Sequence, residues 1–424
     1  MNKIFLKILP ESIRVMPSVK ETESRLFIAL LIFLMALGPI STDLYLPSLP
    51  SIAAELKADQ AEIQLTLSVF LLGFATSQLI YGPLSDRFGR RPVFIGALVL
   101  YLLASLTCSF SNTIEELIIL RFVQALGACA GPVLSRTIVR DVYRRDEAAR
   151  IMSWMGMAMA LAPAVGPVIG GQVEILFGWR ANFLVLSGFS TLALLWLLLR
   201  LPETNRDLNM EAMQLPRLIR NYFGLLRNTR YMGYVLISTG SFSGIFCFIS
   251  GSPFVLIDQL GLSPDVFGLY FAVIVVGYMA GTFLSAQFTL RLGLHRMIMI
   301  GSSVSFAGGL IAVGLSLFGE LNLLNVVGPF AVFTIGAGLT FPNNMAAALA
   351  PFPRIAGSAS ALMGFIQMIF ASGVGVLISS YNDGTALSMT ASLAGVTGMA
   401  FASYVFLIHP HKLETLDSPT TPAI

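Results

Sequence analysis

Long uninterrupted runs of apolar residues constrain this chain more than any other feature. Several runs exceed eighteen residues with at most one charge, and a helix of about that length crosses a hydrocarbon core about 30 Å thick. Because backbone groups in lipid must be satisfied within the segment, we expect α-helices, and the runs are too long and uniformly apolar for barrel strands. Ending the runs at charges, prolines and Gly/Asn/Asp clusters gives twelve predicted spans, at residues 26–47, 61–83, 92–110, 115–140, 150–173, 180–200, 231–257, 265–289, 295–318, 321–348, 354–380 and 386–408.

The composition is that of an integral membrane protein. Of 424 residues, 55% are hydrophobic and only 12% are charged, against roughly 25% charged in an average soluble domain. This argues against a soluble enzyme or a soluble nucleic-acid-binding protein. Cys108, Cys129 and Cys247 lie in apolar runs without C-x-x-C spacing, so we expect buried core residues rather than disulfides or a zinc site.

The positive charges are distributed very unevenly between the two sides of the predicted membrane. An even number of spans puts both termini on one side, and 23 of the 26 Lys and Arg residues fall on that side. Lys57 and Arg180 fall on the other side, and Arg121 lies inside a span. By the positive-inside rule both termini are expected to be cytoplasmic. The net charge of +3 hides this asymmetry, and the basic face indicates topology rather than a nucleic-acid patch.

The connection at 201–230 divides the spans six and six. It carries Pro202 and Pro216 and is rich in basic residues, and we take it as a cytoplasmic linker. The predicted organisation is a cytoplasmic N-terminal tail (1–25), an N-terminal six-helix bundle (26–200), the linker (201–230), a C-terminal six-helix bundle (231–408) and a cytoplasmic C-terminal tail (409–424).

The two ends of the chain give weaker signals. No small-residue cleavage site follows a sustained apolar stretch at the N-terminus, so we predict no cleaved signal peptide. Residues 4–9 form a weakly amphipathic start, and we favour a solvated tail over a surface-bound helix there.

A faint internal repeat supports two related halves. Gly82, Arg87 and Gly89, in the loop after the second span, are matched 204 residues later by Ala286, Arg291 and Gly293 after the eighth span. Two weakly similar six-helix halves are a recurrent transporter plan, in which substrate is held near the midplane between them.

The loop after the second span carries the sharpest motif. Its sequence is Gly82-Pro-Leu-Ser-Asp86-Arg87-Phe-Gly89-Arg90-Arg91, which resembles the cytoplasmic loop motif G-x-L-(S/A)-D-R-x-G-R-(R/K) of the major facilitator superfamily at every defined position. Glycines permit a tight turn, and an aspartate can accept hydrogen bonds from arginines or lie at a helix N-terminus. We interpret the loop as a conformational clamp that favours one transport state; the alternative is a basic loop that only sets topology.

Two further segments resemble elements of proton-coupled facilitators. In the fourth span, Arg121-Phe-Val-Gln124-Ala-Leu-Gly127 is similar to R-x-x-Q-x-x-G, and an unpaired Arg in a span costs at least roughly 2.5 kcal/mol, so it should find a partner or a wet cavity. The fifth span contains a segment that is similar to the antiporter motif of drug exporters. Its small residues let helix backbones meet, and its prolines kink the helix. The alternative is a tightly packed helix without that role. The motif residues are Pro163, Gly166, Pro167, Gly170 and Gly171.

A fourth segment narrows the resemblance. Thr42-Asp43-Leu44-Tyr45-Leu46-Pro47-Ser48-Leu49-Pro50 is similar to the T-D-x-Y-L-P-x-x-P element of the Bcr/CflA-type drug resistance transporters. All four motifs lie in the first half. In the second half Leu290 stands where the loop motif would have its aspartate, so a second clamp is in doubt.

The resemblance implies an all-α integral membrane protein of twelve helices in two six-helix bundles, the major facilitator fold. It further implies proton-coupled efflux of amphipathic drug-like compounds across the bacterial inner membrane by alternating access. No organic cofactor or metal is implied, since the proton gradient supplies the energy, and nothing requires more than a monomer.

Asp43 lies inside the first span and is the leading candidate for the proton carrier. Arg121 enters its span from the same outer side, so the two side chains are expected at similar depth. A state-dependent change in their separation would load and release a proton. The alternative is that Asp43 is solvated at the outer interface and caps the helix end.

Polar groups within otherwise apolar spans are candidates for the substrate cavity, mixed with Met and Phe side chains that make adaptable binding surfaces. The candidates are Tyr45, Gln64, Gln124, Asn343 and Gln367, with Asn344 beside them.

Three other functions fit the sequence less well. A facilitator for one defined metabolite is the nearest rival, and the antiporter motif counts against import. A membrane-embedded enzyme would need a clustered nucleophile, base or metal set, yet the histidines are only His295, His409 and His411. A channel would need charged rings or a carbonyl-lined filter, and no such pattern is visible.

Overall fold

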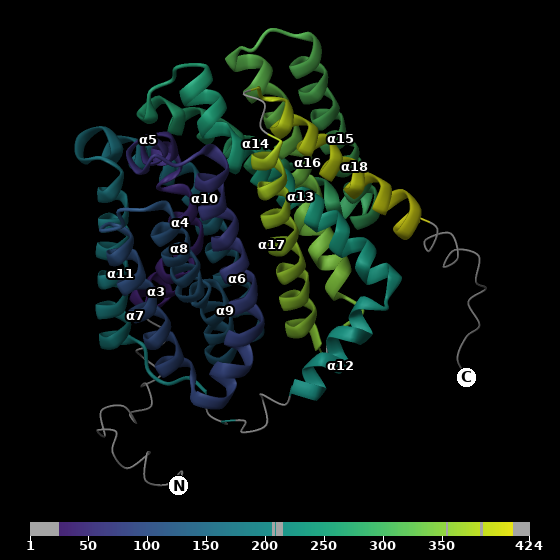
Figure 1. Ribbon diagram of the computed structural model, residues 1–424. Coiled ribbons are helices and arrows are strands. Elements are labelled where there is room, and N and C mark those ends of the chain that lie inside the picture. Colours follow the sequence, from purple (N-terminus) through teal and green to yellow (C-terminus); the bar gives the residue numbers. More distant parts are fainter. Residues whose placement is uncertain (1–24, 206–207, 209–214, 353–354, 382–384, 410–424) are drawn as a thin grey trace, which may run out of the picture.

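The fold is known from a computed structural model, which describes residues 25–205, 208, 215–352, 355–381 and 385–409. Most of both predicted tails and part of the linker lie outside these residues. The described elements are helical, with no strand among them, and twelve are long and apolar enough to cross a membrane. The prediction of an all-α protein with twelve spans is therefore confirmed, and Figure 1 shows its two groups of helices side by side.

The first six crossings make up one half. The first crossing is broken into α3 (Arg25–Met35), α4 (Leu37–Asp43), the short η2 (Leu46–Ser48) and α5 (Leu49–Leu56), and the fourth into α8 and α9. The others are single helices. Their bounds are α6 (Gln60–Phe88), α7 (Arg90–Cys108), α8 (Ile114–Ala128), α9 (Ala130–Val142), α10 (Arg145–Phe177) and α11 (Trp179–Arg200).

The second half follows a short linker helix, α12 (Leu215–Leu226). Its first crossing is α13 (Thr229–Pro253) extended by the π-helical turn η3 (Phe254–Gln259), and its last is α18 (Leu387–Ser403) extended by η5 (Tyr404–Ile408). Between them lie α14 (Pro264–Leu292), α15 (Leu294–Phe318), α16 (Leu323–Leu349) and α17 (Ala356–Ser380).

Two prolines break the first crossing. A proline ring clashes with the carbonyl four residues earlier and offers no N–H to it. Four residues before Pro39 is Met35, the last residue of α3, and four before Pro47 is Asp43, the last residue of α4. The crossing continues beyond the predicted end at residue 47 as far as Leu56. Asp43 therefore lies at a break within the crossing.

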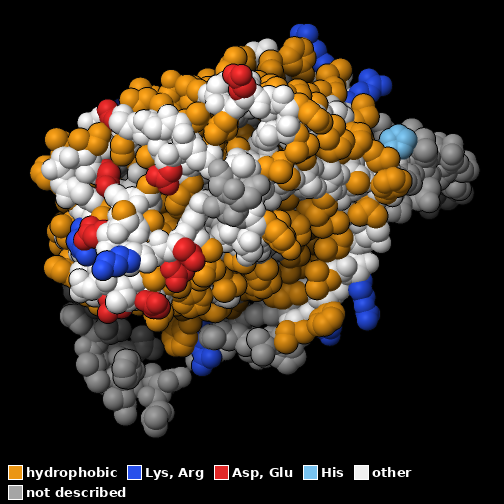
Figure 2. Space-filling model, turned by 45° about the horizontal axis from the view of Figure 1, so that its top comes forward, with side chains coloured by type: hydrophobic (Ala, Val, Ile, Leu, Met, Phe, Trp, Pro, Cys, Tyr) orange, Lys and Arg blue, Asp and Glu red, His pale blue; other side chains and the backbone are white. Residues whose placement is uncertain are grey.

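The ends of the crossings define two faces. We call the face near Arg25, Arg200 and Ile408 the terminal face, and the face near Leu56 and Phe318 the opposite face. Among described residues, the cations of the opposite face are Lys57 and Arg180. Figure 2 views that face: acidic side chains are scattered over it, and hydrophobic side chains cover the flanks.

The internal repeat has a structural counterpart. Gly89 joins α6 to α7 and Gly293 joins α14 to α15, and both have a positive φ, of 99° and 80°. An L side chain is strained at such a φ, so glycine is required at both turns. The repeat thus preserves the turn geometry even where Leu290 replaces the loop aspartate.

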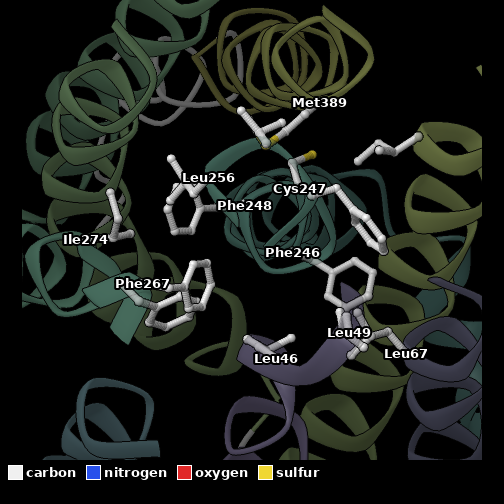
Figure 3. Packing of buried hydrophobic residues seen from close by; sticks show 14 of the residues in the cluster. Leu46, Leu49, Leu67, Phe246, Cys247, Phe248, Leu256, Phe267, Ile274 and Met389 are labelled. Atoms are coloured by element: carbon white, nitrogen blue, oxygen red, sulfur yellow. The ribbon is translucent and has the colours of Figure 1, made fainter. Parts of the chain in front are cut away.

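The two halves share one buried cluster toward the opposite face. There one cluster combines Leu46, Leu49 and Leu67 of the first half with Phe246 and Phe267 of the second, and Figure 3 shows these side chains close together. Toward the terminal face the buried residues of each half form a cluster of their own. The members of one cluster come from residues 27–201, and those of the other come from residues 225–408. The halves are therefore packed shut at the opposite face.

Two helix pairs carry the contact between the halves. The helix α10 packs on α14, and α6 packs on α17. The two pairs are equivalent in the repeat, because α6 and α14 are the second crossings of their halves and α10 and α17 are the fifth. Polar contacts also join the halves: Ser372 Oγ of α17 donates to the Ser68 carbonyl of α6 at 2.8 Å, and Gln64 Nε2 of α6 donates to the Ser250 carbonyl of α13 at 3.1 Å.

The shared cluster should hold the opposite face closed. Phe246→Ala removes a buried ring from it, whereas Phe94→Ala removes a buried ring from the cluster of the first half alone. Each change should cost about 3–5 kcal/mol of unfolding free energy. Only Phe246→Ala should also raise the labelling rate of a cysteine placed at buried Ser252 by an impermeant thiol reagent. Equal labelling in the two variants would contradict the assignment.

Candidate functional site

Asp43 is buried within the membrane-spanning part of the first half. Only 2% of its surface is exposed, and the hydroxyl of Thr42 donates to its Oδ1 at 3.1 Å. Among the described residues no ion pair includes it. An intramembrane carboxylate without a cation is energetically costly, and such a residue is therefore a candidate for a functional role. The alternative of a solvated cap at the outer surface does not fit this burial.

Arg121 is fully buried and lies between aromatic rings. Its guanidinium carbon is 4.2 Å from the ring centroid of Tyr45 and 4.3 Å from that of Phe70. Its Nη1 donates to the Ser41 carbonyl at 3.0 Å and to the amide oxygen of Gln124. Cation–π contacts of a desolvated guanidinium are worth about 2 kcal/mol, so the rings and amide offset part of the cost of burial.

Arg121 approaches the first crossing beside Asp43 in sequence without pairing with it. The arginine bonds the backbone of Ser41, two residues before Asp43, and no Asp43–Arg121 ion pair is present in this conformation. Two further bonds complete the network around Arg121: Gln124 Nε2 donates to Ser105 Oγ at 2.7 Å, and the hydroxyls of Ser41 and Tyr101 lie 2.6 Å apart. Arg121 thus reaches the backbone two residues before Asp43, and proton coupling through the pair stays a prediction.

The antiporter motif packs directly on Asp43. A Cβ placed on Gly166 would lie 3.1 Å from Cβ of Asp43, and one on Gly170 would overlap the Leu44 carbonyl. On the other side of the helix, a Cβ on Gly171 would overlap the Pro264 carbonyl of α14. The glycines therefore let α10 approach both the broken first crossing and the second half at backbone distance.

One turn beyond Gly170, Glu174 fastens the same contact. Its carboxylate accepts hydrogen bonds from Ser48 Oγ and from Ser51 Oγ, the latter at 2.6 Å. Asn182 of α11 donates to Ser48 Oγ at 2.8 Å. The sequence prediction missed Glu174 because it ended the fifth span at residue 173, whereas α10 continues to Phe177. The spacing of four from Gly166 through Gly170 to Glu174 was the available signal.

The loop motif forms a charged network inside the first half. Arg90 bridges Asp86 and Asp141, with 2.9 Å to the latter, and its Nη1 donates to Ser85 Oγ at 2.6 Å. Arg91 donates to the Leu198 carbonyl at 3.0 Å. The contacts described for Asp86, Arg90 and Arg91 lie within the first half or with the start of the linker, so they do not join the halves in this conformation. The guanidinium of Arg87 lies over the Phe88 ring. A Cβ placed on Gly82 would meet open space.

The linker begins by binding this loop. Glu203 accepts hydrogen bonds from the backbone N–H groups of Arg90 at 2.9 Å and Arg91 at 3.1 Å, the first residues of α7. Its carboxylate also lies where a side chain on Gly89 would have to go. Asn205 Nδ2 donates to the Asp86 carbonyl at 3.1 Å. A carboxylate on free N–H groups at a helix start is stabilising, and sequence spacing alone could not reveal it across 113 residues.

The predicted cavity residues do not form one group. Tyr45 and Gln124 belong to the Arg121 network, and Tyr45 Oη also lies 2.9 Å from Thr66 Oγ1. Gln64 bridges the halves, as described above. Asn343 donates to Ser285 Oγ at 2.7 Å within the second half, while Gln367 is buried in α17. Neighbouring Asn344 donates to the Tyr234 carbonyl at 2.7 Å.

Comparison with known proteins agrees with this arrangement. The sequence profile that describes the Major Facilitator Superfamily matches residues 31–376. The chain belongs to the Major Facilitator Superfamily. It is thus a multi-pass membrane transporter, as the loop motif and the two six-helix halves suggest.

Its relatives within the superfamily include proteins named for drug resistance. The bicyclomycin resistance protein homolog of Haemophilus influenzae is 31% identical over 382 residues, covering 90% of this chain and 96% of the relative. Multidrug resistance protein D of Escherichia coli is 31% identical over 356 residues, covering 82% and 86%. An uncharacterized MFS-type transporter of Bacillus subtilis, YdgK, is 34% identical over 379 residues, covering 88% and 93%. The resemblance to Bcr/CflA-type transporters is confirmed by these names.

Solved structures of distant superfamily members share the fold. A D-xylose-proton symporter superposes with a TM-score of 0.73 at 16% identity, covering 90% of this chain and 97% of that one. A POT family transporter in complex with a thioalcohol-conjugated peptide gives 0.74 at 13% identity, covering 92% and 97%. These likenesses establish the two-bundle architecture and carry no information about substrate.

The close approach of α10 to the first crossing is testable at Gly170. In Gly170→Ala the added methyl group overlaps the Leu44 carbonyl, which must separate the two backbones. We expect transport to fall by at least about tenfold, since overpacking at a backbone contact costs about 1–3 kcal/mol. In the same helix Gly156 has open space around it, so Gly156→Ala should leave transport unchanged. Normal transport by Gly170→Ala would refute the packing argument.

Glu203 should stabilise the start of α7. Glu203→Ala leaves the N–H groups of Arg90 and Arg91 without their acceptor, and we expect the unfolding free energy to fall by about 1–2 kcal/mol, as for loss of a helix cap. Glu203→Gln keeps an acceptor oxygen and should recover part of the loss. Thermal unfolding in detergent measures both, with exposed Glu320→Ala as the control. A loss no larger than that of the control would disprove the capping role.

Proposed function

We propose that this protein exports amphipathic drug-like compounds from the bacterial cytoplasm in exchange for protons. The observation that carries the proposal is that Asp43 is buried against Gly166 of the antiporter motif and has no ion pair among the described residues. The names of the relatives, which refer to bicyclomycin and multidrug resistance, support drugs as the substrate class. The functional unit we propose is a monomer acting as a transporter and not as an enzyme.

The proposed orientation puts both termini in the cytoplasm and the protein in the inner membrane. The described positive charges support it, since those outside the spans lie on the terminal face apart from Lys57 and Arg180. In this orientation the conformation described here is closed toward the periplasm by the cluster around Phe246.

The mechanism couples helix separation to the state of Asp43. Opening the opposite face requires α10 to part from α14, because Gly171 and Pro264 are in backbone contact there. Since the same helix covers Asp43 through Gly166, its movement admits water and a proton to the carboxylate. Reclosure removes the water and returns Asp43 to its buried position against Gly166. Drug and proton then use opposite states of one rocking motion.

The loop motif supplies the counterpart at the terminal face. In the conformation closed at the opposite face, Arg90 is engaged by Asp86 and Asp141 within the first half. Closure of the terminal face brings the second half to this loop, and residues of the second half then become available as partners for the charged side chains of the loop. The clamp therefore biases the equilibrium between the two states, and its charge pairs tune that bias.

Asp43→Asn tests the proton site. Its amide retains the size of the carboxylate but carries no titratable proton, so efflux driven by a pH gradient in vesicles should fall at least about tenfold. Drug exchange without a gradient should persist, which shows that the variant is folded and binds drug. Exposed Glu115→Gln is the matched control and should transport normally.

Two outcomes would contradict this account. Full pH-driven efflux by Asp43→Asn would remove Asp43 from the coupling mechanism. Failure of the wild-type protein to move any amphipathic compound, together with transport of one defined metabolite, would instead favour a single-substrate facilitator.

A further inference from the structure

The linker helix α12 has features that the transport cycle does not explain. Its sequence contains Arg217 and Arg220 but no acidic residue, and Arg227 follows it directly. It lies at the lower edge of the second bundle in Figure 1, on the terminal face, and packs on α13 and α17. Since α13 crosses the membrane from Thr229, α12 ends beside the point where the chain enters the bilayer.

This helix has a buried and an exposed apolar face that adjoin one another. One face holds Tyr222 and Leu225, which pack against the terminal-face cluster of the second half, and Leu225 is only 1% exposed. The other face holds Ile219, Phe223 and Leu226, which are 43%, 59% and 43% exposed. Their spacing of four and three residues places them in one stripe along the helix. The stripe has no covering element among the described residues.

Exposed arginines follow the edge of this stripe. Arg220 and Arg227 are seven residues apart, so they lie in one row about 90° around the helix from the apolar stripe. Both are exposed, and no ion pair involving either is present among the described residues. An apolar stripe bordered by a row of arginines is typical of helices that lie in a membrane interface.

A cavity adjoins the same end of the helix. Where α12 passes into α13, a space of about 210 Å³ is lined by Asn228, Arg230 and Phe352 among others. It combines a positive charge, an amide and an aromatic ring next to the row of arginines. It therefore offers a place for a polar headgroup close to groups that attract its phosphate.

We propose that α12 lies in the membrane interface at the terminal face and binds anionic phospholipid. The stripe of Ile219, Phe223 and Leu226 enters the acyl region, and Arg220 and Arg227 bind lipid phosphates. The headgroup of one lipid occupies the cavity beside Arg230. A lipid suits the site better than a protein partner because the stripe lies at the level where a neighbouring helix enters the bilayer. The interaction is independent of which substrate is transported.

The position of the stripe is tested by nitroxide accessibility in vesicles. Single cysteines replace Ile219, Phe223 and Leu226, and Gly224→Cys, about 140° around the helix from Ile219, is the control. In phosphatidylcholine vesicles containing phosphatidylglycerol, the stripe labels should be accessible to oxygen and shielded from a water-soluble nickel chelate, and the control label should show the reverse. Equal access of the chelate to all four positions would overturn the proposal, and would instead favour a stripe kept for a soluble partner.

The role of charge is tested by lipid binding to the purified transporter. Phosphatidylglycerol retained after exchange with phosphatidylcholine is measured for the wild type and for Arg220→Gln with Arg227→Gln. Each arginine near an anionic surface contributes about fivefold in affinity, so the pair should lower binding by at least about tenfold at low salt. Exposed Arg291→Gln with Arg296→Gln removes the same charge from the same face and should leave binding unchanged. Equal losses in both pairs would show that net charge alone attracts lipid and would overturn the specific site.

Discussion

The backbone contacts of α10 are the constraint on which the rest of this structure depends. Gly166 and Gly170 bring the helix against Asp43 and Leu44 of the first crossing, and Gly171 brings it against Pro264 of the second half. A single helix thus touches both the candidate proton carrier and the interface between the halves. Since helices in lipid associate through close packing rather than a hydrophobic driving force, loss of these small residues would uncouple the two contacts.

The placement of the buried core follows from this contact. Where α10 meets α14 and α6 meets α17, the side chains of both halves merge into one cluster toward the opposite face. At the terminal face the clusters remain separate, and the charged loop of the first half is bound by Asp141 of the same half and by Glu203 of the linker. One end is thus held by apolar packing, whereas the charged groups described at the other end pair within the first half. In the proposed mechanism, a change at Asp43 shifts the balance between the two ends.

The features that sequence could predict are those encoded locally. Span length, charge asymmetry and the turn glycines Gly89 and Gly293 each follow from a short stretch of chain, and the structure agrees with them. Motif resemblance added the family, which the comparisons confirm. The first crossing was predicted too short, although Pro39 and Pro47 indicated where its helix would break.

Contacts between distant segments could not be predicted in this way. Arg121 was expected near Asp43, yet its bonds go to the Ser41 carbonyl and to aromatic rings, because several partners compete for a buried guanidinium. Glu203 finds two N–H groups over a hundred residues away. The polar side chains chosen for the cavity lie in separate networks, since helix periodicity shows that a residue faces inward but not which neighbour it meets.

Distances across both faces test the central claim that closure alternates between an apolar and a charged end. Nitroxide pairs at Ala54→Cys with Leu321→Cys, and at Arg140→Cys with Leu290→Cys, report the opposite and terminal faces by double electron–electron resonance. When pH is lowered without drug, the first distance should increase and the second decrease together, and Asp43→Asn should not respond. Two distances that change in the same direction, or a full response in Asp43→Asn, would contradict the account.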